Sequence, residues 1–87
     1  MLILTRKLNE SVVIGEDIIT VLNINKCQIY LDVNISECVT INLKESVSIR
    51  ENTSVTAVKI KEGQVKLGIT APDSVIIRRE EVPEESE

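Results

Sequence analysis

Glu10-Ser11-Val12-Val13-Ile14 and Glu45-Ser46-Val47-Ser48-Ile49 decide the fold of this chain, because the sequence around them repeats. With Glu10 placed on Glu45, the match continues downstream after one extra residue in the next turn. The further matching segments are 20–24 with 56–60, 28–31 with 64–67, and 39–41 with 75–77. Such a repeat predicts two copies of one structural unit, and it has to be found before any architecture is named.

The first copy opens with Met1-Leu2-Ile3-Leu4-Thr5-Arg6-Lys7, and no separate segment of this kind precedes the second copy. We therefore assign residues 1–45 to copy one and 45–82 to copy two, which we expect to lack its own first strand. Because 87 residues allow one domain, both copies belong to a single domain, 1–82. Residues 83–87 are predicted to be an acidic disordered tail.

The apolar residues indicate an all-β fold. The chain has 11 Val, 13 Ile and 7 Leu, one Tyr and no Phe or Trp, and β-branched side chains suit a pleated, half-buried surface. No segment has the apolar stripe of an amphipathic helix. The predicted strands are 2–6, 11–14, 18–24, 28–33, 39–43, 46–49, 54–60, 64–69 and 74–79. No Gly- or Ser-rich linker separates the copies, so we expect interlocked sheets with an aliphatic core.

The net charge of −4 is concentrated at one end. Residues 80–87 hold five of the 14 acids, which leaves nine acids against ten bases elsewhere. No stretch reaches the ~20 apolar residues of a membrane span. The N-terminus does not resemble a signal peptide, since its basic residues follow the apolar stretch. We expect a cytoplasmic protein in which Cys27 and Cys38 are free thiols.

Catalysis and metal binding are not supported by the residue types present. The chain has no His, no phosphate-binding Gly-rich loop and no nucleophile elbow, and its cysteines lack zinc spacing. We expect no enzyme, no cofactor and no metal site. Two basic clusters, Thr5-Arg6-Lys7 and Arg78-Arg79, each end an apolar strand. They are either edge charges that prevent sheet aggregation, or a basic rim for phosphates and base edges.

Two motifs carry a resemblance to a known family. They are the opening heptad with Glu10-Ser11, Ile14-Gly15 and Asp17, and the closing Gln64-Val65-x-Leu67-Gly68-Ile69-x-Ala71-Pro72 followed by Val75-x-Ile77-Arg78-Arg79-Glu80-Glu81. Together the chain resembles the carbon storage regulator (CsrA/RsmA) family over residues 1–82. The resemblance implies a bacterial RNA-binding protein that acts after transcription, with a fold of interlocked antiparallel sheets. Here the two copies are expected to form a single-chain pseudo-dimer.

The resemblance also implies partners and a site. Family members bind GGA motifs in hairpin loops of messenger leaders, are sequestered by small RNAs, and can bind a flagellar assembly factor. Each site combines the first strand of one subunit with the last strand, and the loop before it, of the other. The corresponding residues here are Leu4, Thr5, Arg6, Lys7, Ala71, Pro72, Val75, Ile77, Arg78 and Arg79.

Roles follow from the same resemblance. Arg6 and Arg79 are expected to donate charge-assisted hydrogen bonds. Backbone and shape contacts are expected from Leu4, Thr5, Ala71 and Pro72, and an apolar floor from Val75 and Ile77. Copy one has Asp32, Ile35, Ser36 and Leu43 where copy two has Gly68, Ala71, Pro72 and Arg79, so we expect one RNA site instead of two.

Two alternatives remain open at this point. The chain is either an RNA regulator, or a degenerate paralogue that acts as a protein-interaction module or antagonist. It is either a monomeric pseudo-dimer, which we favour, or a homodimer of long chains in which residues 36–53 are an insertion.

Overall fold

The computed structural model describes residues 1–80, with the backbone alone for Arg79 and Glu80. The predicted tail, residues 83–87, lies outside the described residues. The described part is all-β, as predicted, and within it no helix is long and apolar enough to cross a membrane. Its strands are β1 (Leu2–Lys7), β2 (Ser11–Ile14), β3 (Asp17–Ile24), β4 (Gln28–Val33), β5 (Glu37–Asn42), β6 (Ser46–Arg50), β7 (Thr53–Lys61), β8 (Gln64–Thr70) and β9 (Ile77–Glu80).

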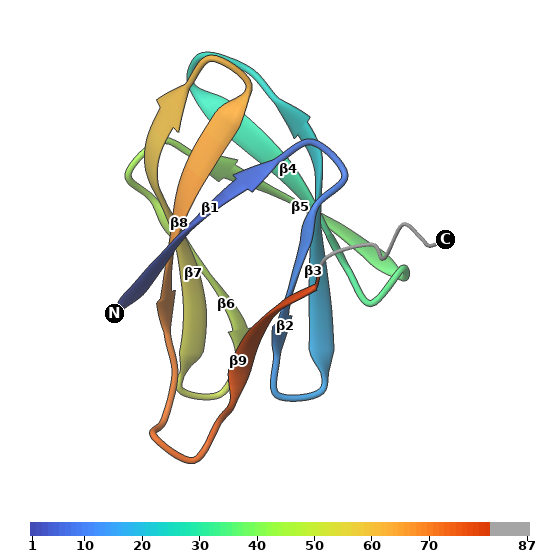
Figure 1. Cartoon of the computed structure of the whole chain (residues 1–87), viewed down its shortest axis with the longest axis vertical. Coiled ribbons are helices and arrows are strands. Elements are labelled where there is room, and N and C mark those ends of the chain that lie inside the picture. The colour runs from blue at the N-terminus through green and yellow to red at the C-terminus, as the bar shows by residue number, and fades with distance from the viewer. Residues whose placement is uncertain (81–87) are drawn as a thin grey trace.

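The strands form two antiparallel sheets that face each other (Figure 1). One sheet has four strands in the order β1-β8-β7-β6, and the other has five in the order β5-β4-β3-β2-β9. Neither sheet is built from consecutive strands alone: β1 joins the sheet of the second copy, and β9 joins the sheet of the first. The two copies are therefore interlocked, as the sequence predicts.

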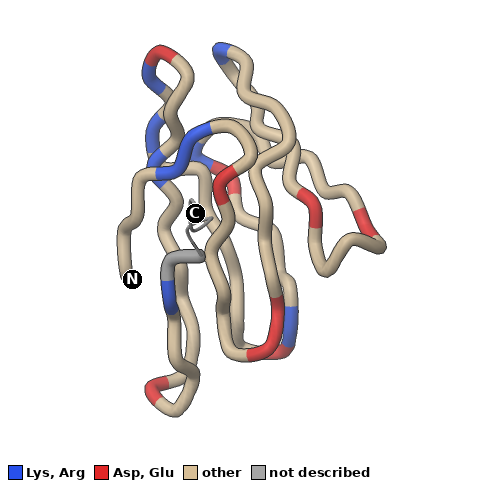
Figure 2. The backbone as a smooth tube through the Cα atoms, turned by 45° about the vertical axis from the view of Figure 1, so that its right-hand side comes forward, with Lys and Arg blue, Asp and Glu red and all other residues tan. Residues whose placement is uncertain are grey.

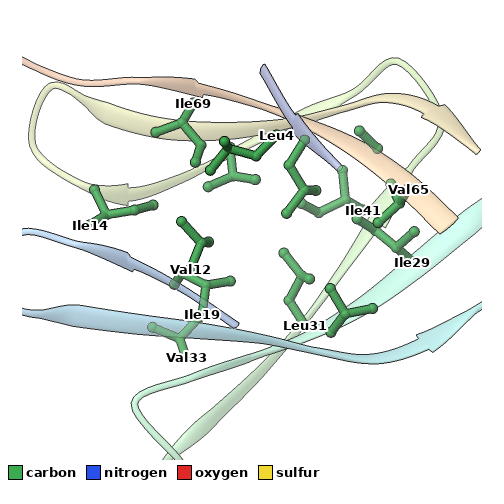
Figure 3. Packing of buried hydrophobic residues seen from close by; sticks show 14 residues of the cluster. Leu4, Val12, Ile14, Ile19, Ile29, Leu31, Val33, Ile41, Val65 and Ile69 are labelled. Atoms are coloured by element: carbon green, nitrogen blue, oxygen red, sulfur yellow. The ribbon is translucent and has the colours of Figure 1, made fainter. Parts of the chain in front are cut away.

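The core between the sheets is aliphatic (Figure 3). Burial alternates along β3, β4 and most of β7, which is the period-two pattern of a sheet with one buried face, whereas β2 and part of β8 are buried on consecutive residues. The largest fully buried side chains are Ile19, Ile29, Leu31, Ile41, Leu67, Ile69, Val12, Val21, Val55 and Val65. Both copies contribute to this one cluster, so neither copy has a core of its own.

The two sheets repeat the same pairing, residue for residue. The pairs Leu4–Leu67, Thr5–Lys66 and Arg6–Val65 of one sheet correspond to Val39–Leu31, Thr40–Tyr30 and Ile41–Ile29 of the other. A residue between 2 and 14 thus corresponds to the residue 35 positions later, and one between 17 and 33 to the residue 36 positions later. We call such pairs symmetry mates.

Even the irregularities of the strands are repeated. The ladder between β3 and β4 is shifted between Val21 and Asn23, and the ladder between β7 and β8 is shifted at the mates, Ala57 and Lys59. The one extra residue of copy two, expected in a turn, instead enters β6 as a second irregularity between Ser48 and Arg50. The two halves of the chain therefore fold as near copies of each other at the level of single hydrogen-bonded pairs.

The prediction that copy two lacks an opening strand is wrong. β5 pairs with β4 in the register that β1 has with β8, so β5 is the opening strand of copy two, which begins near residue 36 and not at residue 45. The missing strand is the closing strand of copy one. Residues 36–53, read in one alternative as an insertion, supply β5 and β6 of the two sheets.

The backbone of each connection goes with this outcome, whereas length alone does not explain it, since the three-residue connections 8–10 and 43–45 lead from one sheet to the other. The turn between β4 and β5 has three residues, 34–36, and Asn34 and Ile35 both have positive φ. Such a short turn holds β5 in a hairpin with β4. The connection between β8 and β9 has six residues, 71–76, and it leads β9 across to the other sheet. The apolar alternation of residues 39–41 fits either place, so the sequence pattern did not distinguish them.

Inward-facing residues of β6 are less buried than their symmetry mates in β2. In the five-stranded sheet β9 pairs with β2, and Val12 and Ile14 of β2 are 0% and 2% exposed. Their mates Val47 and Ile49 are only partly buried, since no strand among residues 1–80 pairs with the outer edge of β6.

An ion pair joins the two halves where the β2–β3 and β6–β7 hairpins turn. The Asp17 carboxylate, 4% exposed, accepts hydrogen bonds from Nε (2.6 Å) and Nη2 (2.8 Å) of Arg50 and from Nδ2 of Asn34 (2.9 Å). These donors, Arg50 above all, lower the pKa of Asp17 from 3.8 to about 2. The symmetry mate of Asp17 is Thr53, so the contact joins residues that are not equivalent.

We predict that Asp17→Asn lowers the free energy of unfolding by about 1.5–3 kcal/mol near neutral pH, the range for hydrogen bonds to charged groups. The folded pKa of Asp17 is below its unfolded value, so this stabilisation is complete above about pH 4 and is lost as the pH falls towards 2. Urea unfolding followed by circular dichroism at several pH values measures both effects.

The exposed neighbour Glu16 provides the control. Glu16→Gln should leave the stability and its decline below pH 4 close to those of the wild type. Equal behaviour of the two variants would show that the Asp17–Arg50 contact adds nothing.

Candidate functional site

One face of β1 is buried in the sandwich and the other is exposed to solvent. Leu4 and Arg6 point into the sandwich and are 8% and 4% exposed, whereas Ile3, Thr5 and Lys7 are exposed on the outer face. Of the four residues that the sequence assigned to the site from this strand, Thr5 and Lys7 are therefore open to a ligand. Leu4 belongs to the hydrophobic core.

Arg6 is a buried cation with local partners. Its Nε donates to the carbonyl oxygen of Thr5 (2.7 Å), its Nη1 donates to that of Ser11 (3.1 Å), and Nε lies 3.8 Å from Oε1 of Glu10. The guanidinium thus fastens the end of β1 to the start of β2. Burying a charge is costly unless it is paired and hydrogen-bonded, and these contacts offset part of that cost.

The symmetry mate of Arg6 is Ile41, which is 2% exposed and belongs to the core. The same backbone position therefore accepts an apolar side chain in one half of the molecule and a guanidinium in the other. The fold does not require arginine at this position, so a role beyond packing is the simplest reason for its presence.

The closing half of the site follows β8. In the connection 71–76, Pro72 is exposed and Ala71 is partly exposed; Val75, and Ile77 at the start of β9, pack against the core. The connection rests on the β2–β3 turn, where the amide of Gly15 donates to the carbonyl oxygen of Ile76 (2.8 Å). Gly15 has φ +65°, and a Cβ built on it would lie 3.5 Å from Cγ1 of Val75. A shallow depression at this point is lined by Gly15, Ser74, Val75, Ile76 and Arg78.

β2 brings the two ends of the chain together. β1 continues into β2 through residues 8–10, and β9 pairs along the other side of β2, with Arg79 opposite Val12 and Glu80 opposite Ser11. Because Arg6 donates to Ser11, its guanidinium lies one backbone pair away from the position of Arg79. Figure 1 shows β9 rising along β2 towards the end of β1.

The connection 71–76 lies at the opposite end of β2 from Arg6. Four strand residues separate the two ends, roughly 10 Å. The predicted residues thus form a band along one edge of the sandwich. Thr5, Lys7, Pro72 and Arg78 are exposed in this band, while Arg6, Val75 and Ile77 form its inner side.

Lysines of the second copy were missed in the sequence. Lys59, Lys61 and Lys66 line a depression with Thr5 and Gln64 on the outer face of β1, β8 and β7. Strict alternation would place Lys59 on the same face as Ala57, which is fully buried. The ladder shift between Ala57 and Lys59 turns Lys59 outward instead. The bulge gave no clear signal in the sequence. Among residues 1–80 no cluster of His, Cys, Asp or Glu is suited to a metal ion.

The structure defines a class of protein: a two-sheet, all-β pseudo-dimer in which two copies of one unit share a core. Comparison with known proteins identifies the family. The CsrA model, described as a global regulator protein family, matches the chain twice, over residues 1–42 and 38–87. The chain therefore belongs to the CsrA family. The second match begins at β5, in agreement with the assignment of that strand to copy two.

Curated relatives match a little under half of the chain. The translational regulator CsrA of Clostridium kluyveri is 51% identical over 43 residues, which cover 49% of this chain and 59% of the relative. The translational regulator CsrA of Lachnospira eligens is 50% identical over 38 residues, which cover 44% of this chain and 52% of the relative. The chain thus spans somewhat over half the length of these relatives. No solved structure was found to match.

We predict that Arg6→Ile, which copies the symmetry mate, leaves the fold intact and either preserves or raises the free energy of unfolding. Replacement of a buried ionic group by a well-packed apolar one is often neutral or stabilising by about 1–4 kcal/mol. Urea unfolding of Arg6→Ile and wild type measures the difference. The reciprocal variant Ile41→Arg is the matched control: the mates of Arg6's partners, Thr40, Glu45 and Ser46, are the same residue types, so it should fold, with a lower free energy of unfolding because the apolar packing of Ile41 is lost. A large loss of stability in Arg6→Ile would contradict the equivalence of the two positions.

Proposed function

We propose that this protein binds single-stranded or hairpin-loop RNA containing GGA, through one site per chain, and so regulates translation or messenger stability. Membership of the CsrA family supports this, as do relatives that are translational regulators. Messenger leaders are the proposed targets, and small RNAs with GGA motifs are proposed competitors. Unpaired loop bases expose their edges to hydrogen bonds, which suits a narrow band of donors on a sheet edge.

One observation carries the proposal of a single site: within residues 1–80 the closing strand occurs once. β9 lies on β2, next to the end of β1, whereas the equivalent edge of β6 has no strand partner among residues 1–80. The opening strand of copy two also has Ile41 and Asn42 in the positions of Arg6 and Lys7. In the part of the chain that the structure describes, the second half therefore lacks the closing strand and both basic residues.

The proposed chemistry divides the band into three parts. Arg79 donates to a phosphate or to the acceptor edge of guanine, for which a planar guanidinium is suited. Arg6, whose guanidinium is buried, holds the start of β2 through Ser11, one backbone pair from that position. Thr5, Lys7 and the backbone of residues 71–76 supply shape and phosphate contacts, while Leu4, Val75 and Ile77 support them from the core.

We predict that Arg79→Ala weakens binding of a GGA hairpin by about 1.5–3 kcal/mol, roughly 10- to 150-fold in Kd. Arg6→Ile, with its fold checked as above, should weaken binding in the same direction. Lys26→Ala removes one exposed charge from the turn between β3 and β4 and is the control. Gel shift or fluorescence anisotropy gives the Kd values. If Arg79→Ala and Lys26→Ala lose the same affinity, the assigned site is wrong.

We predict a monomer that holds one RNA. A second chain is not needed, because each sheet already contains an opening strand and three strands of a meander. Sedimentation equilibrium should give 9.7 kDa. Native mass spectrometry with an RNA carrying two GGA hairpins should show up to two proteins per RNA, and the apparent affinity should not depend on the spacing of the motifs. A two-site protein would instead gain roughly 10²–10⁴ by bridging. One chain that carries two separate hairpins at once would refute the single site.

A further inference from the structure

Five lysines gather around the outer face of the four-stranded sheet. They are Lys7 on β1, Lys66 on β8, Lys59 and Lys61 on β7, and Lys44 in the turn that leads into β6. Figure 2 shows Lys and Arg segments of β1, β7 and β8 close together in the upper part of the molecule. The sheet and the turn that leads into β6 therefore present half of the ten basic residues of the chain over a small area.

Strand register brings these lysines together. Thr5, Lys66 and Lys59 are paired across three neighbouring strands, and Lys7, Gln64 and Lys61 form the next such row. The Lys44 amide donates to the carbonyl oxygen of Ala57 on β7 (2.6 Å), and Lys44 lines a depression with Lys59 and Lys66. Adjacent strands lie about 5 Å apart, so the rows extend roughly 10 Å from β1. We call the outer face of β1, β8 and β7 with these five residues the lysine face.

The charge on the lysine face is not neutralised by the fold. Among residues 1–80, none of the five lysines forms an ion pair; the two ion pairs there involve Arg6 and Arg50. Glu10 accepts from the amide of Lys7, and Glu45 accepts from Nδ2 of Asn42. Glu62, exposed in the β7–β8 turn, adjoins Lys61 and offsets part of the charge at that end of the lysine face. Like charges this close repel each other, so the arrangement favours binding of a polyanion.

The other sheet provides an internal comparison. The symmetry mates of the five lysines are Asn42, Tyr30, Asn23, Asn25 and Asn9. Not one of them is charged, although the backbone, the pairing and the bulge are the same. The fold therefore does not need the lysines. Solubility alone does not explain the lysines either, because basic side chains on both outer faces would serve it equally well.

We propose that the lysine face binds the phosphodiester backbone of RNA that continues beyond the GGA motif. This inference rests on the proposed function, because the lysine face begins on β1, the strand that supplies Thr5 and Lys7 to the site. An RNA that leaves the site over β1 meets Lys66 and then Lys59 on the neighbouring strands. Lysines act here as point charges that contact phosphates without reading bases.

The test replaces lysines by their symmetry mates in the triple variant Lys59→Asn/Lys61→Asn/Lys66→Tyr. Each substituted residue already occupies the same backbone position in the other sheet, so we expect the variant to fold. Three RNAs are compared by fluorescence anisotropy over a range of salt concentrations: a minimal GGA hairpin, the same hairpin with short unstructured extensions on both sides, and an extended hairpin with a scrambled loop.

For the wild type we expect tighter binding of the extended hairpin than of the minimal one. In the triple variant the salt dependence, the slope of log K against log [salt], should fall by about 0.7 per lysine, or about 2 in total, for the extended RNA. The preference for GGA over the scrambled loop should stay unchanged, since phosphate contacts carry no sequence information.

A relocated variant controls for net charge. It combines the triple variant with Asn23→Lys, Asn25→Lys and Tyr30→Lys, which moves three lysines to the equivalent places on the other sheet. We expect it to behave like the triple variant. A return of the wild-type slope would show that net charge, and not the lysine face, attracts RNA, and would overturn the inference.

The remaining outcomes separate the two proposals. If the wild-type protein prefers GGA but the triple variant keeps the wild-type salt dependence, the lysine face is refuted and the GGA site is not. An acidic protein would then be the ligand to test. If the wild-type protein shows no GGA preference but the triple variant has a reduced salt dependence, the sequence-specific site is refuted. The lysine face is then supported as an RNA-binding surface.

Discussion

The structure depends on the sheet to which the connection after β4 and the connection after β8 lead the chain. After β4 the chain turns within three residues, and β5 pairs back onto the strand that precedes it. After β8 six residues allow the chain to reach the other sheet, where β9 pairs with β2. One edge can pair with one strand only, so these two choices fix the whole arrangement: two opening strands, two meanders and one closing strand. The asymmetry of the molecule follows from this difference.

Joining two equivalent units in one polypeptide allows equivalent positions in the two copies to hold different residues. In a symmetric homodimer a substitution appears at both equivalent positions. Here Arg6 has Ile41 as its mate, Asp17 has Thr53, and the lysine face is matched by asparagines and a tyrosine. The contact between Asp17 and Arg50 joins residues that are not equivalent, and its partner arginine enters where copy two has one residue more. Each half can therefore specialise without altering the other.

The core tolerates this divergence because it is made of interchangeable aliphatic residues. Val, Ile and Leu fill both inner faces, and one cluster spans both copies. The costly groups are few in the described part: a guanidinium at Arg6 and a carboxylate at Asp17, each held by hydrogen bonds. Arg6 holds β1 to β2 within copy one, Asp17 joins the two hairpins, and most of the remaining stability comes from apolar packing.

The sequence by itself determined the strand content, the repeat, the family resemblance and most strand boundaries, because period-two alternation and local turn residues are encoded nearby in the chain. It also predicted that β1, the connection 71–76 and β9 contribute to one candidate site. Only the tertiary structure decided which edge residues 37–42 occupy, since their alternation fits both. It also decided that Arg6 is buried and that Lys59 and Lys61 face outward. Those outcomes depend on hydrogen-bond register between distant strands and on a bulge, and a one-residue shift in register moves a side chain from the core face to the solvent face.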